Sequence, residues 1–85
     1  MKKVYTTFRL SAEPGADVAV CGSFNNWKPV PMREPKPGKF ARRFRLDSGE
    51  HQYKFVVNGR WIIDPECNEW CLNSHGTMNS ICSVA

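Results

Sequence analysis

Apolar and polar residues alternate along much of the chain with the two-residue period of β-strands. In residues 3–11 (KVYTTFRLS) the even-numbered positions are mostly apolar, whereas odd-numbered positions carry Tyr5 and Arg9. Successive side chains of a strand point to opposite faces, so this segment is expected to form a half-buried strand.

Three further segments have strand character. They are residues 17–22 (DVAVCG), 39–47 (KFARRFRLD) and 80–85 (SICSVA). In residues 39–47 the large apolar side chains fall at even-numbered positions and share one face, whereas Arg43 and Arg45 lie on the opposite face. Each segment is bounded by turn residues, which is typical of short antiparallel strands.

A proline-rich segment follows the first of these strands. Residues 28–39 (KPVPMREPKPGK) contain four prolines, and proline cannot donate a hydrogen bond within a sheet. The segment is therefore expected to be an irregular connection at a sheet edge.

The clearest local signal is Asn58-Gly59, which lies between two apolar, β-branched runs. This pair predicts a two-residue hairpin turn with positive φ at both residues. Because such a turn leaves no slack, Val56 pairs with Trp61. Lys54 then lies diagonally across from Trp61, within about 7–8 Å and on the same face.

No apolar pattern with a helical period persists anywhere in the chain. Residues 66–79 (ECNEWCLNSHGTMN) read as polar turns, and the pattern leaves open whether Trp70 completes the core. Several short strands separated by turns predict an all-β fold, a compact antiparallel β-sandwich. A chain of 85 residues is expected to form a single domain, residues 1–85.

The sequence also indicates the cellular compartment of the protein. The sequence has no run of about 18 apolar residues and no apolar N-terminal signal, so we expect a soluble, cytoplasmic protein with no membrane partner. In that compartment the four cysteines are expected to be free thiols.

The net charge of +4 is unevenly placed, because all 12 Lys and Arg residues fall within residues 1–60. Arg42, Arg43 and Arg45 cluster in one predicted strand, as in single-strand nucleic-acid binders. A solvated strand face is the more common explanation, so nucleic acid is not the favoured partner. A nucleic-acid or protein-interaction module using the basic strand 39–47 remains the alternative.

Two tryptophans suggest a different ligand class. An indole ring offers a large rigid apolar plate to the C–H face of a sugar ring, while amide and ammonium groups hydrogen-bond its hydroxyls. The hairpin register argues against burial of Trp61 in the main core. Trp27 lies in a predicted loop, and its position alone does not decide between burial and exposure.

Three motifs carry a family resemblance: VAVCGSFNNW, GEHQYKFVVNGRWIIDP and HGTMNSI. In order and spacing they resemble the glycogen-binding domain of the AMP-activated protein kinase β subunit. That domain belongs to a carbohydrate-binding module group shared with the N-terminal domains of starch-branching and debranching enzymes. The resemblance covers roughly residues 4–84. It implies an immunoglobulin-like antiparallel β-sandwich that binds glycogen, starch, maltooligosaccharides and cyclodextrins without cleaving them.

The resemblance also implies a set of carbohydrate-binding residues. They are Trp27, Lys54, Trp61, His75, Thr77 and Asn79. The two tryptophans would stack on sugar rings, and Lys54 and Asn79 would contact hydroxyls. His75 replaces a leucine of the mammalian pattern and follows a connection one residue longer. No cofactor, metal or catalytic residue is implied.

The partners implied are an α-glucan polysaccharide or oligosaccharide and, as a second partner, a separately expressed glycogen- or starch-active enzyme. Kinase assembly is not expected to carry over, because this sequence stops at its last predicted strand.

Two other site types are conceivable. Asp64, Glu66 and Glu69 offer carboxylates of the kind that hydrolyse glycosidic bonds. Asp64 reads as a strand-terminating turn residue, however, and so short a chain builds no deep cleft. We therefore expect no enzyme activity.

The second conceivable site type is a zinc site. Cys67, Cys71 and His75 are potential zinc ligands spaced four apart. That spacing is wider than the usual zinc knuckle, and a fourth ligand is not evident, so a metal site is disfavoured.

Overall fold

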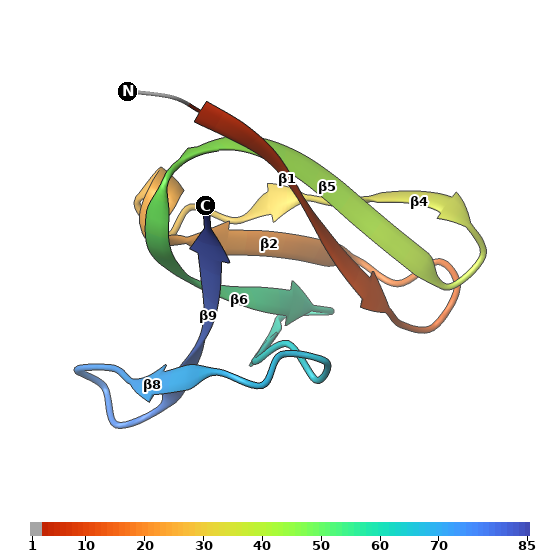
Figure 1. The fold of residues 1–85 in the computed structure, drawn as a ribbon. Coiled ribbons are helices and arrows are strands. Elements are labelled where there is room, and N and C mark those ends of the chain that lie inside the picture. Colours follow the sequence, from red (N-terminus) through yellow and green to blue (C-terminus); the bar gives the residue numbers. More distant parts are fainter. Residues whose placement is uncertain (1–2) are drawn as a thin grey trace.

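A computed structural model describes residues 3–85, which form nine strands in two antiparallel sheets (Figure 1). The strands are β1 (Lys3–Ser11), β2 (Val18–Gly22), β3 (Val30–Pro31), β4 (Arg33–Lys36), β5 (Lys39–Asp47), β6 (Gly49–Val57), β7 (Arg60–Ile62), β8 (Trp70–Leu72) and β9 (Met78–Val84). One 3-10 turn, η1 (Ser23–Asn25), follows β2. The all-β expectation is confirmed.

The two sheets differ in size. The smaller has the order β1-β5-β4, and the larger has the order β3-β2-β6-β9-β8 with β7 paired to β6. Figure 1 shows β1, β5 and β4 forming one layer, with β2, β6 and β9 beneath it. Residues 3–85 include no helix long and apolar enough to cross a membrane.

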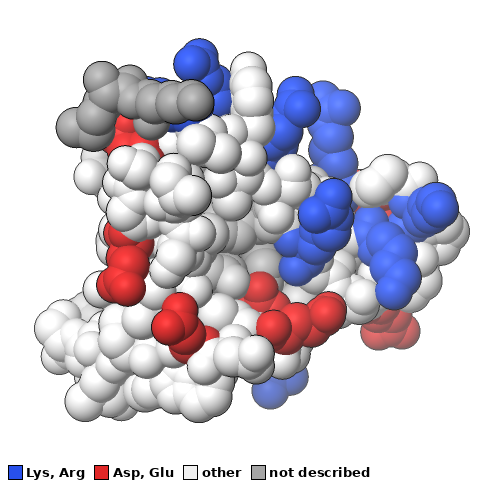
Figure 2. Space-filling model, viewed as in Figure 1, with Lys and Arg blue, Asp and Glu red and all other residues white. Residues whose placement is uncertain are grey.

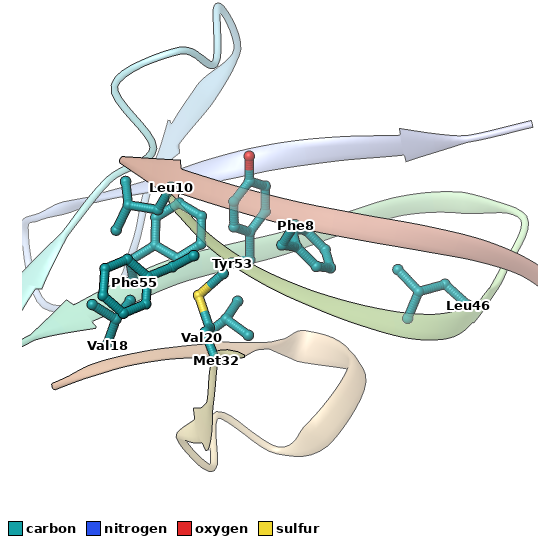
Figure 3. Packing of buried hydrophobic residues seen from close by; sticks show 9 residues of the cluster. Phe8, Leu10, Val18, Val20, Met32, Leu46, Tyr53 and Phe55 are labelled. Atoms are coloured by element: carbon teal, nitrogen blue, oxygen red, sulfur yellow. The ribbon is translucent and has the colours of Figure 1, made fainter. Parts of the chain in front are cut away.

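The core lies between the two sheets, as the alternation predicts. Phe8 and Leu10 of β1 meet Val20 of β2 and Phe55 of β6, and Val20 and Phe55 are completely buried (Figure 3). The Phe8 ring lies 4.7 Å from the Tyr53 ring, centroid to centroid. Side chains of one parity on each strand therefore fill the core, and those of the other parity form the two outer faces of the sandwich.

The proline-rich segment is more regular than expected. β3 and β4 are short strands at the outer edges of the larger and smaller sheets, with Ala19 opposite Pro31 and Arg33 opposite Ala41. The edge position is as predicted, and part of the expected irregularity is present, because the register of β4 against β5 shifts between Arg33 and Lys36. An edge strand has one unpaired side, so prolines are tolerated there.

β8 lies within the segment for which the sequence predicts only turns. It pairs with β9, with Cys71 opposite Asn79 and Leu72 opposite Met78. Three residues are too few to show a period, so pairing with β9 rather than local pattern determines this strand.

The basic cluster expected on one strand face is divided between two faces. Arg43 and Arg45 point outward from β5, with their guanidinium carbons 4.6 and 5.6 Å from the centroid of the Tyr5 ring. Arg42 lies opposite Phe8, on the core-facing side, and its Nη1 donates to the Pro31 carbonyl at 3.2 Å. The two-residue period of the strand causes this split.

Candidate functional site

The loop between β2 and β3 begins at a glycine that has no room for a side chain. A Cβ on Gly22 would lie 2.5 Å from the Gln52 carbonyl oxygen of β6 and would overlap Cε2 of Phe24. The Phe24 ring itself stacks on Phe8, with centroids 5.5 Å apart. Gly22 therefore lets the loop start close against β6 while Phe24 anchors it to the core.

The two asparagines in GSFNNW shape the rest of this loop. Asn25 Oδ1 accepts from the Gly22 amide at 3.0 Å, and Asn25 Nδ2 donates to the Lys28 carbonyl at 2.9 Å. Asn26 and Trp27 have φ of 57° and 60°, a left-handed conformation that asparagine tolerates and tryptophan rarely adopts. The Trp27 amide donates to the Gly22 carbonyl at 2.9 Å, so the loop holds Trp27 in this strained conformation.

The β6–β7 hairpin presents the second tryptophan. Asn58 and Gly59 have φ of 49° and 83°, and Val56 lies opposite Trp61, so the predicted turn and register are confirmed. Asn58 Oδ1 also accepts from the Asp17 amide at 2.9 Å, tying the turn to the start of β2. Trp61 is 50% exposed on the outer face of the larger sheet.

All six residues expected to bind carbohydrate surround one open hollow of about 840 Å³ on that outer face. The hollow is lined by Trp27, Gln52, Lys54, Trp61, Leu72, Asn73, Ser74, His75, Thr77 and Asn79. The structure thus brings together three distant parts of the chain: the loop after β2, the β6–β7 hairpin and the β8–β9 hairpin. Their role in binding stays a prediction.

Four lining residues were not proposed from the sequence. Gln52 could have been found, because it shares the outward parity of Lys54 on β6. Leu72, Asn73 and Ser74 depend on the β8–β9 pairing, which the sequence pattern did not reveal. Leu72 is 68% exposed and gives the rim of the hollow an apolar side chain close in sequence to His75.

Side chains at the floor of the hollow are joined by hydrogen bonds. Lys54 Nζ donates to Thr77 Oγ1 at 3.0 Å, and Asn73 Nδ2 donates to the same oxygen at 2.7 Å. Asn79 Nδ2 donates to Gln52 Oε1 at 2.9 Å. These bonds fix the positions of the polar groups before any ligand arrives, which lowers the entropy lost on binding.

Among residues 3–85, the hollow is lined by the cationic side chain of Lys54 and by no acidic side chain. Lys54 is only 9% exposed, because the β8–β9 hairpin and Trp61 cover the face of β6 on which it lies. Cys21, paired with Lys54 across β2 and β6, is fully buried, and this burial raises the pKa of its thiol from 9.0 to about 11. The thiol beneath the site is therefore neutral at physiological pH.

Trp70 lies outside the hollow. It is 51% exposed on β8, as much as Trp61, so it does not complete the core. The two tryptophans thus differ in their surroundings rather than in their exposure.

The acidic residues considered for hydrolysis have structural contacts. Asp64 Oδ2 accepts from the Tyr53 hydroxyl at 2.7 Å, and Oδ1 accepts from the Glu66 amide at 3.0 Å. Burial and the contact with Asp64 raise the pKa of Tyr53, which keeps the phenol protonated as the donor. Asp64 therefore closes the turn after β7, as its sequence context suggested.

The potential zinc ligands are not grouped. Cys67 Sγ instead faces the carbonyl oxygens of Glu69 and Ile81, at 3.1 and 3.3 Å. Within residues 3–85, no three His, Cys, Asp or Glu side chains are placed to hold a metal ion together.

Basic residues gather on the opposite layer. In Figure 2, Lys and Arg lie mainly over β1, β5 and β4, whereas the region around β8 is largely uncharged in this view. The alternative interaction surface on strand 39–47 is therefore separate from the hollow, on the other face of the sandwich.

Comparison with known proteins adds a family match. The glycogen recognition site of AMP-activated protein kinase, as a family, matches residues 4–85. The chain is 41% identical over 80 residues to 5'-AMP-activated protein kinase subunit beta-1 of Sus scrofa, covering 93% of this chain and 62% of that one. Identity to the beta-1 subunit of Rattus norvegicus is also 41% over 80 residues, covering 93% and 28%.

A beta-2 subunit is similar as well. The chain is 39% identical over 74 residues to 5'-AMP-activated protein kinase subunit beta-2 of Mus musculus, covering 86% of this chain and 27% of the relative. The chain thus spans less than two thirds of the Sus scrofa relative and less than a third of the other two.

Proposed function

This chain belongs to the family of the AMP-activated protein kinase glycogen recognition site, a carbohydrate-binding family, and we propose that its hollow binds α-1,4-linked glucans without cleaving them. The observation that carries the proposal is the convergence of Trp27, Trp61 and a prearranged polar floor on one open face. Glycogen, starch, maltooligosaccharides and cyclodextrins all present the required curved chain of glucose units.

The tryptophans supply the apolar part of recognition. Trp61 stands half exposed on a paired strand, and the strained loop holds Trp27 at the same hollow. Two rigid indole plates lose little conformational freedom on binding, and each covers the C–H face of one glucose ring. Exposed Leu72 offers a third apolar contact to the hollow, three residues before the position where His75 replaces the mammalian leucine.

The polar floor supplies orientation. Lys54, Thr77 and Asn79 lie where hydroxyls at the edge of a stacked ring need hydrogen-bond partners. His75, in the loop that borders the hollow, contributes a ring that a sugar can contact from the side.

Hydrolysis is not part of this function. Both oxygens of Asp64 accept hydrogen bonds from the protein itself, and within the part of the chain that the structure describes no carboxylate lines the hollow. The cytoplasmic location and a partner enzyme that acts on glycogen or starch remain predictions from the sequence.

The experiment is a titration with maltoheptaose or β-cyclodextrin, followed by NMR of the indole N–H resonances and by calorimetry. Trp61→Ala and Trp27→Ala should each weaken binding by about 2 kcal/mol, roughly thirtyfold, because each removes one stacking plate. Trp70→Ala is the matched control, since Trp70 is as exposed as Trp61 but does not line the hollow. Its affinity should equal that of the wild type.

Two outcomes contradict the proposal. One is that a short α-glucan leaves the resonances of Trp27 and Trp61 unchanged. The other is that Trp70→Ala weakens binding as much as Trp61→Ala. Binding should also respond little to salt, whereas a nucleic acid bound on the basic layer loses affinity steeply as salt rises.

A further inference from the structure

The directions of the hydrogen bonds at the floor of the hollow are set by the backbone. Asn73 Oδ1 accepts from the amides of His75 and Thr77, at 2.9 and 3.1 Å. Backbone N–H groups only donate, so the orientation of the Asn73 side-chain amide is fixed. Its Nδ2 must then be the atom that faces Thr77 Oγ1 and Asn79 Oδ1, at 2.7 and 3.0 Å.

The orientation of Asn73 also fixes the direction of the next hydrogen bonds along the floor. Because Asn79 Oδ1 accepts from Asn73, Asn79 Nδ2 is the atom that donates to Gln52 Oε1. Gln52 Nε2 is then a hydrogen-bond donor, and no atom of the described residues accepts a hydrogen bond from it. The network thus uses carbonyl oxygens internally and leaves N–H groups for a ligand.

Thr77 is constrained in the same way. Its Oγ1 accepts from Asn73 Nδ2 and from Lys54 Nζ, and neither of these nitrogens can accept a hydrogen bond in return. The Thr77 hydroxyl hydrogen must therefore point away from both, as a donor available to the ligand. Lys54 Nζ has two further hydrogens beyond the one given to Thr77.

Charge adds to this asymmetry. Lys54 is nine-tenths buried, and no Asp or Glu of the described residues lines the hollow to balance its charge. A buried ammonium without an anionic partner is costly, so an anion that reaches it is bound with extra free energy. Sugar hydroxyls both donate and accept, and they satisfy this donor-rich floor only in part. A group with several acceptor oxygens and negative charge matches it better.

We propose that the preferred ligand is an α-glucan carrying a phosphate monoester on one glucose unit, with the phosphate oxygens at Lys54 Nζ and Thr77 Oγ1 and the glucan on the tryptophans. This inference rests on the proposed glucan binding and specifies its substrate class. A phosphate monoester has three terminal acceptor oxygens, enough to use the outward donors of Lys54 and Thr77 together.

The test compares three ligands by calorimetry: maltoheptaose, maltoheptaose with one 6-phosphate ester, and glucose 6-phosphate. At about pH 7.5 the phosphorylated maltoheptaose should bind roughly tenfold more tightly than the neutral one, because charge-assisted bonds replace neutral ones. The advantage should shrink below about pH 6, where the phosphate takes up its second proton. Glucose 6-phosphate should bind far more weakly, because it lacks the further rings that the tryptophans stack on.

Variants separate this site from general electrostatic attraction. Lys54→Met should lower the ratio of phosphorylated to neutral affinity from about ten to about one, and Thr77→Val should lower it in part. Arg45→Gln is the matched control, because it also removes one positive charge, and Arg45 lies on β5 in the opposite layer. Its ratio should stay at the wild-type value.

Each contrary result has a separate meaning. Equal affinity of the wild-type chain for the two maltoheptaoses overturns the phosphate preference and leaves glucan binding intact. Binding of neither overturns the proposed function itself. Equal affinity for glucose 6-phosphate and phosphorylated maltoheptaose assigns the floor to free sugar phosphates, and an equal loss of preference in Arg45→Gln assigns the effect to net charge. Either result refutes the inference. The wild-type comparison does not depend on whether Lys54→Met folds.

Discussion

Replacement of Gly22 by alanine tests how the loop that carries Trp27 is built. Gly22 has φ of −168°, an extended conformation that alanine adopts freely, so any effect of the change is steric. The new methyl group would lie 2.5 Å from the Gln52 carbonyl oxygen and would overlap the edge of the Phe24 ring. The ring could turn aside only by leaving its stack on Phe8, and the carbonyl belongs to the backbone of β6.

The magnitude follows from these two obstacles. Overpacking of a well-packed site costs about 1–3 kcal/mol, and here a backbone contact cannot be relieved by a rotamer change, so we expect the upper end, about 2–3 kcal/mol. For a domain of this size such a loss lowers the melting temperature by roughly 10–20 °C. Displacement of the loop should also weaken binding of maltoheptaose, because the Trp27 amide bonds to the Gly22 carbonyl.

Urea unfolding and thermal melts followed by circular dichroism measure the loss of stability. Calorimetry measures the loss of affinity for maltoheptaose. Gly15→Ala is the control. Gly15 has φ of 82° and open space around its Cβ position, so alanine there strains the backbone without a clash and lies away from the hollow. It should lose about 1 kcal/mol of stability and keep its glucan affinity. If Gly22→Ala is as stable as the wild type and binds glucan equally well, the account of this loop is refuted.

Two further predictions concern stability away from the ligand. Asn58→Ala should lower the free energy of unfolding by about 1–2 kcal/mol, because it removes the acceptor for the Asp17 amide and places alanine at positive φ. Unchanged stability in urea unfolding would contradict this, and glucan affinity should not change. Burial raises the pKa of the Cys21 thiol to about 11, so the folded state favours the protonated thiol. This contribution is fully present below about pH 9 and should be lost as pH rises to about 11, by up to about 3 kcal/mol. The free energy of unfolding of Cys21→Ala, measured in urea, should fall less between about pH 9 and about pH 11 than that of the wild type. An equal fall in both proteins would refute the assignment to Cys21.

Much of the fold follows from local sequence signals. The strict alternation in residues 3–11 and the Asn58-Gly59 turn each fix which side chains face the core, and both expectations are confirmed. The register of that turn is also sufficient to predict that Lys54 and Trp61 share one outer face. Short-range patterns suffice here because a one-residue slip would expose an entire apolar face.

The remainder of the site depends on pairing between distant segments. β8 has three residues, and its place beside β9 brings Leu72 and Asn73 to the hollow. Nothing local to that segment distinguishes it from the turns on either side. The direction of the Asn73 side-chain amide is decided by the backbone amides of His75 and Thr77, in the loop that connects β8 to β9. Arg42 illustrates the reverse error, since three neighbouring arginines suggested one surface and the strand period divided them between two.

The sandwich carries its hollow and its cation-rich layer back to back, with the core between them. A molecule lying flat on a polysaccharide particle would turn Tyr5, Arg43 and Arg45 toward the surrounding solution. Attachment to the particle would therefore fix which side of the domain any other macromolecule meets, so that a coated particle would display a positively charged outer shell.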